Sequence, residues 1–319
     1  MSELKTTSLS HKDNNTGTPN ITMYPDGTTS IGLTHTGGLK NQLINGNIVV
    51  RQRVMTGNSG FVCDRFFVDH AADTANDGPP GLERVIFAGG STNCQVRQAI
   101  ELDNPNKQNQ FAPGTTWTAS VWARSPAGVP SFAFTYRKGL QDSTGEQQVF
   151  NPVWQLMSST GETAGSSANA SNVYTRYSYS FTMPDLQSSI SSNSLTCVVA
   201  NFRFEGDYRA TGFTVEPGPT ATVFEMRPIG LELSLCQRYY LKGWSLGQQL
   251  VISSGTVKRS QASFPQTMRA TPTFTNPTTN NGTVNNVSGS SNNIIIKLTG
   301  ANAAQDGLVN GDWTADAEL

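Results

Sequence analysis

The fold is decided by the stretch Thr116-Trp117-Thr118-Ala119-Ser120-Val121-Trp122-Ala123-Arg124, in which residue character alternates with a period of two. Successive side chains of a β-strand point to opposite faces of its sheet, so Trp117 and Val121 share one face and Trp122 lies on the other. A helix would need apolar residues to recur every three or four positions. The stretch therefore predicts a β-strand that places Trp117 in the core.

The same alternation recurs between about residues 82 and 226, in short runs separated by clusters of Gly, Pro, Asn and Ser. Three further runs place aromatic and β-branched residues on one face: Phe132, Phe134 and Tyr136; Tyr177, Tyr179 and Phe181; and Val198, Ala200, Phe202 and Phe204. Helical periodicity is almost absent. Two packed antiparallel sheets bury such one-sided strands, so we predict an all-β fold built on a jelly-roll β-sandwich.

The length of 319 residues accommodates two domains and an arm. We expect an N-terminal arm at residues 1–40, the jelly roll at residues 41–240, and a second, smaller β-sandwich-like segment at residues 241–319. In the arm, Pro25-Asp26-Gly27 is a turn signal between two short alternating stretches, which predicts a hairpin. The hairpin has too little apolar surface to stand alone, so it needs a partner; a frayed terminus is the alternative.

A short helix is expected at the end of the jelly roll, over Leu231–Tyr240, directly after a strand over Ala221–Met226. Leu231, Leu235 and Tyr239 recur at helical spacing there. Four cysteines are too scattered for a zinc site or a disulfide framework, and we expect them to be buried thiols.

Composition excludes several classes of partner. Charged residues make up 14% of the chain, against about 25% in an ordinary globular protein, and the net charge is −1. No basic cluster is present, which argues against nucleic acid and against anionic lipid. No window approaches 18 consecutive apolar residues and residues 1–10 lack a signal-peptide core, so we expect neither membrane insertion nor Sec export.

Flat aromatic side chains are the candidates for binding a sugar. Trp122 faces away from Trp117, and Trp154 lies in a long insertion at about Gly139–Asn172 whose second half, Ser158–Ser171, is expected to be flexible. We take Trp154 and Trp122 as weak ligand-binding candidates. The alternatives are core packing for the two tryptophans and an insertion without a ligand.

Cofactor and catalytic signals are weak. The aspartates at 64, 69, 73 and 77 surround a loop and offer oxygen ligands that Ca²⁺ could use, but they lack the compact order of a calcium loop. A solvated polar loop, with His70 at its surface, is favoured. No Ser-His-Asp order, phosphate-binding glycine loop or HExxH motif is present. We therefore predict no catalytic residues, no metal and no cofactor, with calcium as the alternative.

Several motifs resemble a family of bacteriophage tail-fibre and virion structural proteins. These are Asn41-Gln42-Leu43-Ile44-Asn45-Gly46-Asn47, Arg51-Gln52-Arg53 and Asp64-Arg65-Phe66, followed by Val96–Glu101 and Thr116–Ser125. The block Thr220–Pro228 and then Glu232–Tyr240 is similar to the family's TATxFExRPxxxELxLCQRYY signature. The resemblance covers residues 41–319 and departs from the pattern at Val50 and Phe66, where the family has Trp, and after Arg53, where it has Gly.

The resemblance implies a carbohydrate-binding-module-like jelly roll, made in the bacterial cytoplasm and carried on the virion. It implies a tail-fibre module for host adhesion, bound to other virion proteins by its arm, forming a homo-oligomer that is expected to be a trimer, and attaching to a host surface glycan. The alternative is a capsid decoration or head-fibre protein. A glycan depolymerase is less favoured, because neither β-helix repeats nor a clear acid pair is visible.

The signature residues are expected to be structural. They are Glu225, Arg227, Glu232, Arg238, Tyr239 and Tyr240. Glu225 and Arg227 lie two apart on the expected strand and point the same way, so they can pair with each other or with Glu232 and Arg238. A buried arginine–carboxylate clamp between helix and sheet accounts for these charged residues.

Overall fold

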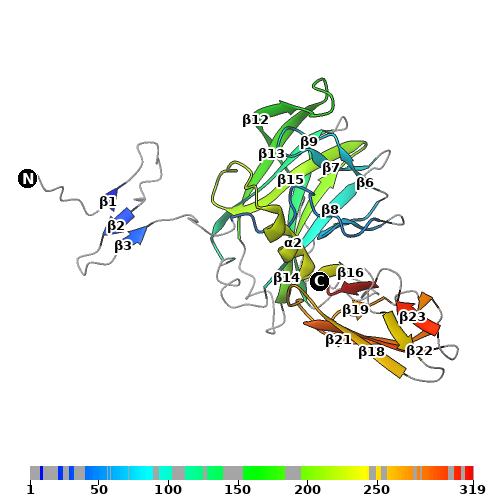
Figure 1. Ribbon diagram of the computed structural model, residues 1–319. Coiled ribbons are helices and arrows are strands. Elements are labelled where there is room, and N and C mark those ends of the chain that lie inside the picture. The colour runs from blue at the N-terminus through cyan, green and yellow to red at the C-terminus, as the bar shows by residue number, and fades with distance from the viewer. Residues whose placement is uncertain are drawn as a thin grey trace, which may run out of the picture. The chain divides into compact units, whose positions relative to one another are not determined.

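A computed structural model of the chain (Figure 1) describes most of residues 40–319 and three short strands before them. The described residues are 8–9, 21–23, 29–31, 40–55, 57, 59–70, 72–88, 93–102, 111, 113–124, 128–138, 154–183, 195–243, 249–252, 257–275, 279–280, 282–300, 305–309 and 313–318. The chain divides into two compact units, residues 1–40 and residues 41–319.

The first unit contains a three-stranded antiparallel sheet. Its strands are β1 (Ser8–Leu9), β2 (Ile21–Met23) and β3 (Thr29–Ile31), in the order β1-β2-β3. Strands β2 and β3 pair with Ile21 opposite Ile31, which places a hairpin where the sequence predicts one.

The second unit begins with two six-stranded sheets. The β8 sheet has the order β11-β10-β14-β8-β5-β4. Its strands are β4 (Gly60–Cys63), β5 (Phe66–Val68), β8 (Cys94–Glu101), β10 (Ser131–Lys138), β11 (Gln155–Leu156) and β14 (Leu195–Phe204). The β9 sheet has the order β12-β13-β9-β15-β7-β6. Its strands are β6 (Asp73–Asn76), β7 (Arg84–Ala88), β9 (Thr116–Arg124), β12 (Ser158–Gly165), β13 (Val173–Thr182) and β15 (Tyr208–Pro217).

This strand order is that of a jelly roll. Strands β7, β8, β9 and β10 alternate between the two sheets, and so do β13, β14 and β15. The neighbours β7-β15-β9-β13 in one sheet and β8-β14-β10-β11 in the other are the two interleaved Greek keys of that fold. All described strand pairs in the two sheets are antiparallel. The predicted all-β jelly roll is confirmed.

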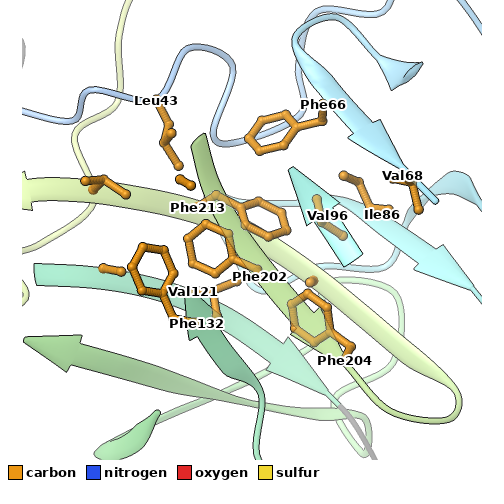
Figure 2. Close-up of a cluster of buried hydrophobic side chains, with 14 of the residues drawn as sticks. Leu43, Phe66, Val68, Ile86, Val96, Val121, Phe132, Phe202, Phe204 and Phe213 are labelled. Atoms are coloured by element: carbon orange, nitrogen blue, oxygen red, sulfur yellow. The ribbon is translucent and has the colours of Figure 1, made fainter. Parts of the chain in front are cut away.

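The core lies between the two sheets and follows from the alternation along each strand. Phe202 and Phe204 of β14 and Phe213 of β15 point into the space between the sheets, together with Phe132 of β10 (Figure 2). Trp117 is 1% exposed and its ring stacks on Phe111 at a centroid distance of 4.5 Å. Burying one such side chain stabilises the fold by about 1.5–3 kcal/mol.

The C-terminal segment forms three small sheets with a hydrophobic cluster of its own. The orders are β16-β24-β19, β17-β23-β20 and β18-β22-β21. The strands are β16 (Tyr240–Gly243), β17 (Gln249–Ile252), β18 (Val257–Ser263), β19 (Thr273–Phe274), β20 (Thr279–Asn280), β21 (Gly282–Ser290), β22 (Asn293–Gly300), β23 (Gln305–Val309) and β24 (Trp313–Asp316). Ile294, Ile296 and Trp313 are buried in this cluster. The segment nevertheless belongs to the same compact unit as the jelly roll.

The helix differs from its prediction. Helix α2 spans Ile229–Gln237 and starts directly after Pro228, whose fixed φ suits a helix start. Its buried residues are Glu232 and Cys236, whereas Leu231 is 42% exposed. The apolar spacing placed the helix over 231–240, which is two residues late at its start and three at its end, and the carboxylate of Glu232 is buried in the ion pair expected for the signature.

Two other segments also differ from their predictions. Residues 221–228 form no strand, and the backbone of Thr222 bonds to side chains of the β9 sheet rather than to a neighbouring strand. Thr222 donates its N–H to Glu216 at 2.7 Å and its carbonyl accepts from Arg176. Ser158–Gly165, expected to be flexible, is the edge strand β12. Its side chains are mostly polar and exposed, so no alternation marks it.

Other sequence expectations can be placed directly. The four cysteines are buried thiols, as predicted. Residues 139–153, the first half of the long insertion, lie outside the described residues, as does the side chain of Tyr136. Within the described part of the chain, no helix has the length and apolar character needed to cross a membrane.

Candidate functional site

The two tyrosines of the signature build a joint between the jelly roll and the C-terminal segment. The guanidinium carbon Cζ of Arg65 lies 3.4 Å from the ring centroid of Tyr239, and that of Arg53 lies 4.2 Å from the ring centroid of Tyr240. Both guanidiniums form ion pairs with the carboxylate of Glu318. We call these five residues the arginine–tyrosine joint.

The joint is closed to solvent. The side chains of Arg53, Arg65 and Glu318 are 9%, 1% and 7% exposed. Strand β16, which starts at Tyr240, pairs with β24 just before Glu318, and the N–H of Ala317 donates to the carbonyl of Tyr239 at 2.8 Å. A buried guanidinium requires a counter-charge, and here each one has the same carboxylate. The joint therefore holds two parts of the fold together and presents little surface to a ligand.

A second buried ion pair fixes α2 to the start of the jelly roll. Arg227 and Glu232 form the predicted pair at 3.3 Å. Arg227 also donates to the carbonyl oxygens of Leu43, at 3.0 Å, and Asn41. Glu232 accepts the backbone N–H of Asn45. The sequence predicts a clamp between helix and sheet, but this ion pair joins the helix to residues 41–45, which form no strand and are another of the motifs on which the resemblance rests.

The remaining charged residues of the signature have partners that the sequence did not predict. Arg238 forms an ion pair with Glu101 of β8 at 3.0 Å, and Arg269 of the C-terminal segment lies 3.8 Å from the same carboxylate. Glu225 accepts the backbone N–H of Asn41 at 3.4 Å. The signature is therefore accounted for by contacts that hold the fold together.

A cavity of about 530 Å³ lies at one end of the β9 sheet, away from the signature. It crosses four neighbouring strands, at the ends of β7 and β9 and the starts of β13 and β15. Its lining residues are Phe87, Ala88, Ala123, Arg124, Val173, Thr175, Tyr177, Asp207, Tyr208 and Arg209. The volume falls within the range of about 300–1,000 Å³ that is usual for small-molecule sites.

Asp77 does not line the cavity but forms ion pairs with two arginines that do. Its Oδ2 lies 2.9 Å from Nη1 of Arg209 and 3.8 Å from Nη2 of Arg124. Ser166 donates its hydroxyl to the Oδ1 of Asp77 at 2.5 Å. The side chains of Arg124 and Arg209 remain 29% and 31% exposed. A guanidinium carries five N–H donors, so this ion pair fixes both arginines and leaves donors that can reach a sugar hydroxyl.

Aromatic rings supply the apolar part of the cavity. Phe87 is half-buried and lies under Arg209, with the guanidinium carbon 5.2 Å from its ring centroid. Tyr177 is half-buried and packs against the core, and Tyr208 is 2% exposed and stacks on Phe204. Burial raises the pKa of Tyr208 well above its ordinary value, which keeps its hydroxyl protonated. Phe87 shares the face of Arg209, whereas Tyr177 and Tyr208 point to the core face of the sheet, so Phe87 is the ring that lies beside a fixed polar donor, as a sugar-binding site needs.

Neither tryptophan that the sequence singled out lines this cavity. Trp154 is half-buried just before β11, and the guanidinium carbon of Arg203 lies 5.5 Å from its ring centroid. Trp122 is half-buried on the outer face of the β9 sheet, where a Cβ on Gly212 would lie 3.0 Å from its ring. Gly212 has a φ of +61°, a conformation that favours glycine. Ligand binding by Trp154 and Trp122 stays a prediction.

The aspartates considered for calcium have separate protein partners. Asp64 accepts from Gln52, Asp69 from Gln95, Asp73 pairs with Arg51, and Asp77 pairs with Arg209. No three of these carboxylates, all of them described, gather around one point. Asp77 instead forms ion pairs with the two arginines of the cavity.

Sequence reasoning missed the cavity because its residues come from four strands that are far apart in the chain. Arg124 and Arg209 each stand at one end of a strand with predicted alternation. In a jelly roll such strand ends converge, so charged residues at several of them are the signal that could have identified the site.

No protein-family model matches the chain. No curated protein matches it either. Among solved structures, the chain is similar to the enzymatically active domain of tailspike protein 4 from bacteriophage CBA120, with 16% identity over 56% of this chain and 22% of that chain, at a TM-score of 0.31. The CBM22-1–GH10 part of xylanase 10B from Clostridium thermocellum shares 13% identity over 53% of this chain and 28% of that chain, at a TM-score of 0.28.

The mannan-binding carbohydrate-binding module TmCBM27 shares 8% identity over 49% of this chain and 90% of that module, at a TM-score of 0.24. The match spans less than a third of the tailspike and xylanase chains. At TM-scores this low, the likenesses carry no conclusion about function, which has to come from the site.

Proposed function

We propose that this chain is a structural protein of a bacteriophage virion, a tail-fibre module that binds a host surface glycan in the cavity of the β9 sheet. The single observation that carries glycan binding is the cavity itself, in whose lining Phe87 lies under Arg209 and Asp77 holds Arg209 and Arg124 in place. The virion assignment is supported by the motifs between Asn41 and Tyr240 and by the low charge of the chain.

The charges around the cavity favour a neutral or weakly charged sugar. Arg124 and Arg209 are matched by the carboxylates of Asp77, outside the lining of the cavity, and Asp207, in its lining. The balance leaves no excess positive charge to attract a polyanion. Hydrogen bonds to hydroxyls and stacking on ring faces would then provide the affinity.

The proposal is one of binding without catalysis. Glycoside hydrolysis ordinarily uses a pair of carboxyl groups that flank the scissile bond. Among the ten described residues that line the cavity, only Asp207 has a carboxylate. Asp77 forms ion pairs with two guanidiniums and does not line the cavity.

Weak single sites suit a multivalent attachment protein. The arm is proposed to attach the module to other virion proteins and, with a second and third copy of the chain, to form a trimer. Linking several sites on one particle raises the overall affinity by about 10²–10⁴ without any new contact at each site. A monomer in light scattering would contradict the trimer while leaving the glycan site open.

The test is retention of the purified chain on immobilised surface polysaccharides from a panel of bacterial strains. We expect wild type to be retained on the polysaccharide of a susceptible strain and to block phage adsorption to it. Phe87→Ala should weaken retention by about tenfold, because loss of a stacking ring removes roughly 1 kcal/mol or more.

Phe67→Ala is the matched control. Phe67 of β5 is also a half-buried phenylalanine under an arginine, with the guanidinium carbon of Arg97 5.0 Å from its ring centroid, but it does not line the cavity. Equal losses in the two variants would contradict the proposed site. Failure of wild type to bind any polysaccharide or to block adsorption would leave a structural role, such as capsid decoration. Density for the chain over capsomers in a map of the whole particle would then support that alternative.

A further inference from the structure

Three potential metal ligands converge at the start of β8. Asp69 and His70 follow β5 directly, and Cys94 is the first residue of β8. The carboxylate of Asp69, a ring nitrogen of His70 and Sγ of Cys94 all lie within 4.8 Å of one another. Their side chains differ in exposure: His70 is 44% exposed, Asp69 is 22% exposed and Cys94 is fully buried.

The backbone fixes the two segments that carry these donors. Asp69 donates its N–H to the carbonyl of Gln95 at 3.3 Å, and its Oδ1 accepts the N–H of Gln95 at 2.7 Å. Val68 pairs with Val96 in the adjoining ladder. Asp69 and Cys94 are therefore held next to each other by the sheet, and the bond from Gln95 orients the carboxylate as an outer partner orients a metal ligand.

The distances between the potential ligand atoms are close to those between the ligands of a bound metal ion. Nδ1 of His70 lies 3.1 Å from Oδ1 of Asp69. Zn²⁺ binds nitrogen and oxygen at about 2.0–2.2 Å and sulfur at about 2.3 Å, so two ligands of a tetrahedral site lie roughly 3.4–3.6 Å apart. Separations of up to 4.8 Å between the ligand atoms need to close by no more than about 1.4 Å. Rotation of the half-exposed His70 ring can supply this movement.

We infer that Asp69, His70 and Cys94 form a binding site for a borderline-soft divalent metal ion of the zinc class. The mixed set of one sulfur, one nitrogen and one oxygen suits Zn²⁺ rather than Ca²⁺, which takes oxygen ligands only. Binding forms the bond between the metal and Sγ of Cys94 and releases the thiol proton to solvent. A water completes the coordination on the side of His70, which faces solvent.

Two other roles for Asp69, His70 and Cys94 explain fewer of these contacts. A Cys-His-Asp nucleophile would need a sulfur that a substrate can reach, but Cys94 is fully buried in the core of the jelly roll. A purely packing role explains why Cys94 is buried, with Sγ 3.2 Å from the hydroxyl of Tyr208. It does not explain why an imidazole and a carboxylate converge on that sulfur.

The site adjoins the cavity through Tyr208. The hydroxyl of this residue contacts Cys94 and its ring lines the cavity wall. A bound ion would therefore tie β5, β8 and the cavity end of the jelly roll together. It would stabilise the folded chain by mass action, and would do so independently of any glycan.

The experiment uses the untagged, reduced full chain titrated with Co²⁺ and then Zn²⁺. We expect one Co²⁺ per chain, with the near-ultraviolet absorption of a cobalt–thiolate bond and visible bands of tetrahedral Co²⁺. Zn²⁺ should displace it and raise the melting temperature. Cys94→Ser should abolish the thiolate band, whereas Cys197→Ser, a change of another buried thiol on the adjacent strand β14, should retain it.

If Cys94→Ser does not fold, His70→Gln still tests the site, because a substitution at the half-exposed His70 should leave the fold intact. It should weaken Co²⁺ binding at least about tenfold, the scale on which metal sites respond to lost interactions. Two results would each overturn the site: no thiolate absorption in wild type, or binding that His70→Gln and Cys94→Ser both leave unchanged. Neither result would bear on glycan retention, which is measured separately.

Discussion

The arginine–tyrosine joint and the cavity use the same side chains for opposite purposes. Both place guanidiniums against aromatic rings and a carboxylate. In the joint, Arg65 is 1% exposed and its partner Glu318 is 7% exposed, whereas in the cavity Arg124 and Arg209 are about a third exposed and their partner Asp77 is outside the lining. The position of the carboxylate decides whether an arginine joins two parts of the fold or is presented to a ligand.

The residues of the signature and the residues that line the cavity are also different parts of the sequence. Tyr239 and Tyr240 belong to the motif on which the resemblance rests, and both are used in the joint. None of the residues that line the cavity belongs to the block from Thr220 to Tyr240. A substitution at the strand ends around the cavity therefore leaves the contacts of the signature residues in place.

The largest expected loss of stability comes from removing the shared carboxylate of the arginine–tyrosine joint. Glu318→Ala leaves Arg53 and Arg65 without their shared counter-charge, and removing one partner of a buried pair costs about 3–5 kcal/mol. Urea unfolding measures the loss. Asp73→Ala, which breaks the exposed pair with Arg51, is the control and should cost about 1 kcal/mol or less. Similar losses in the two variants would show that the joint is not closed.

The pH dependence of stability tests the burial of the joint in a second way. Asp64 is fully buried beside it, and burial raises the pKa of its carboxyl from 3.8 to about 6. The folded chain holds the Asp64 proton more tightly than the unfolded chain does. The protonated carboxyl therefore adds to the free energy of unfolding below pH 4, and this stabilisation is lost as the pH rises through 6. The difference is on the order of 3 kcal/mol.

Asp64→Asn removes this group from the titration. The free energy of unfolding of the variant should fall less between pH 4 and pH 6 than that of wild type, as measured by urea unfolding at each pH. An unchanged slope would show that Asp64 is solvated in the folded chain.

A smaller effect is expected where the carboxylate supports a binding site. Asp77→Asn removes the charge that holds Arg124 and Arg209, and loss of hydrogen bonds to a charged group costs about 1–3 kcal/mol of stability. Glycan retention should fall as well, because the guanidiniums lose their fixed orientation. If the variant is less stable but retains glycan as well as wild type does, Arg124 and Arg209 do not contribute to the binding site.

The smallest effect is expected at Trp154. Its contact with Arg203 is a partly exposed cation–π pair, worth about 0.5–1 kcal/mol. Since Trp154 does not line the cavity, Trp154→Ala should leave glycan retention nearly unchanged. A loss as large as that of Phe87→Ala would instead support the binding role that the sequence predicts for Trp154.

The sequence predicted the core better than the site. Alternation placed Trp117 and Phe202 correctly, because the period of a strand is a local property of the chain. It missed β12, an edge strand with polar side chains, and it placed the helix over 231–240 rather than Ile229–Gln237, because the helix starts directly after Pro228 and not at the first apolar residue of the spacing. The cavity depends on how strand ends meet across the jelly roll, which no local pattern records.

Hydrogen–deuterium exchange of the chain with and without oligosaccharide from a retained polysaccharide tests the central claim most directly. Backbone amides of residues 84–88, 173–177 and 207–211 should exchange more slowly with the ligand, because those strands surround the cavity. Amides of residues 236–243 and 313–317, at the joint, should be unaffected. Protection at the joint without protection around the cavity would contradict the account.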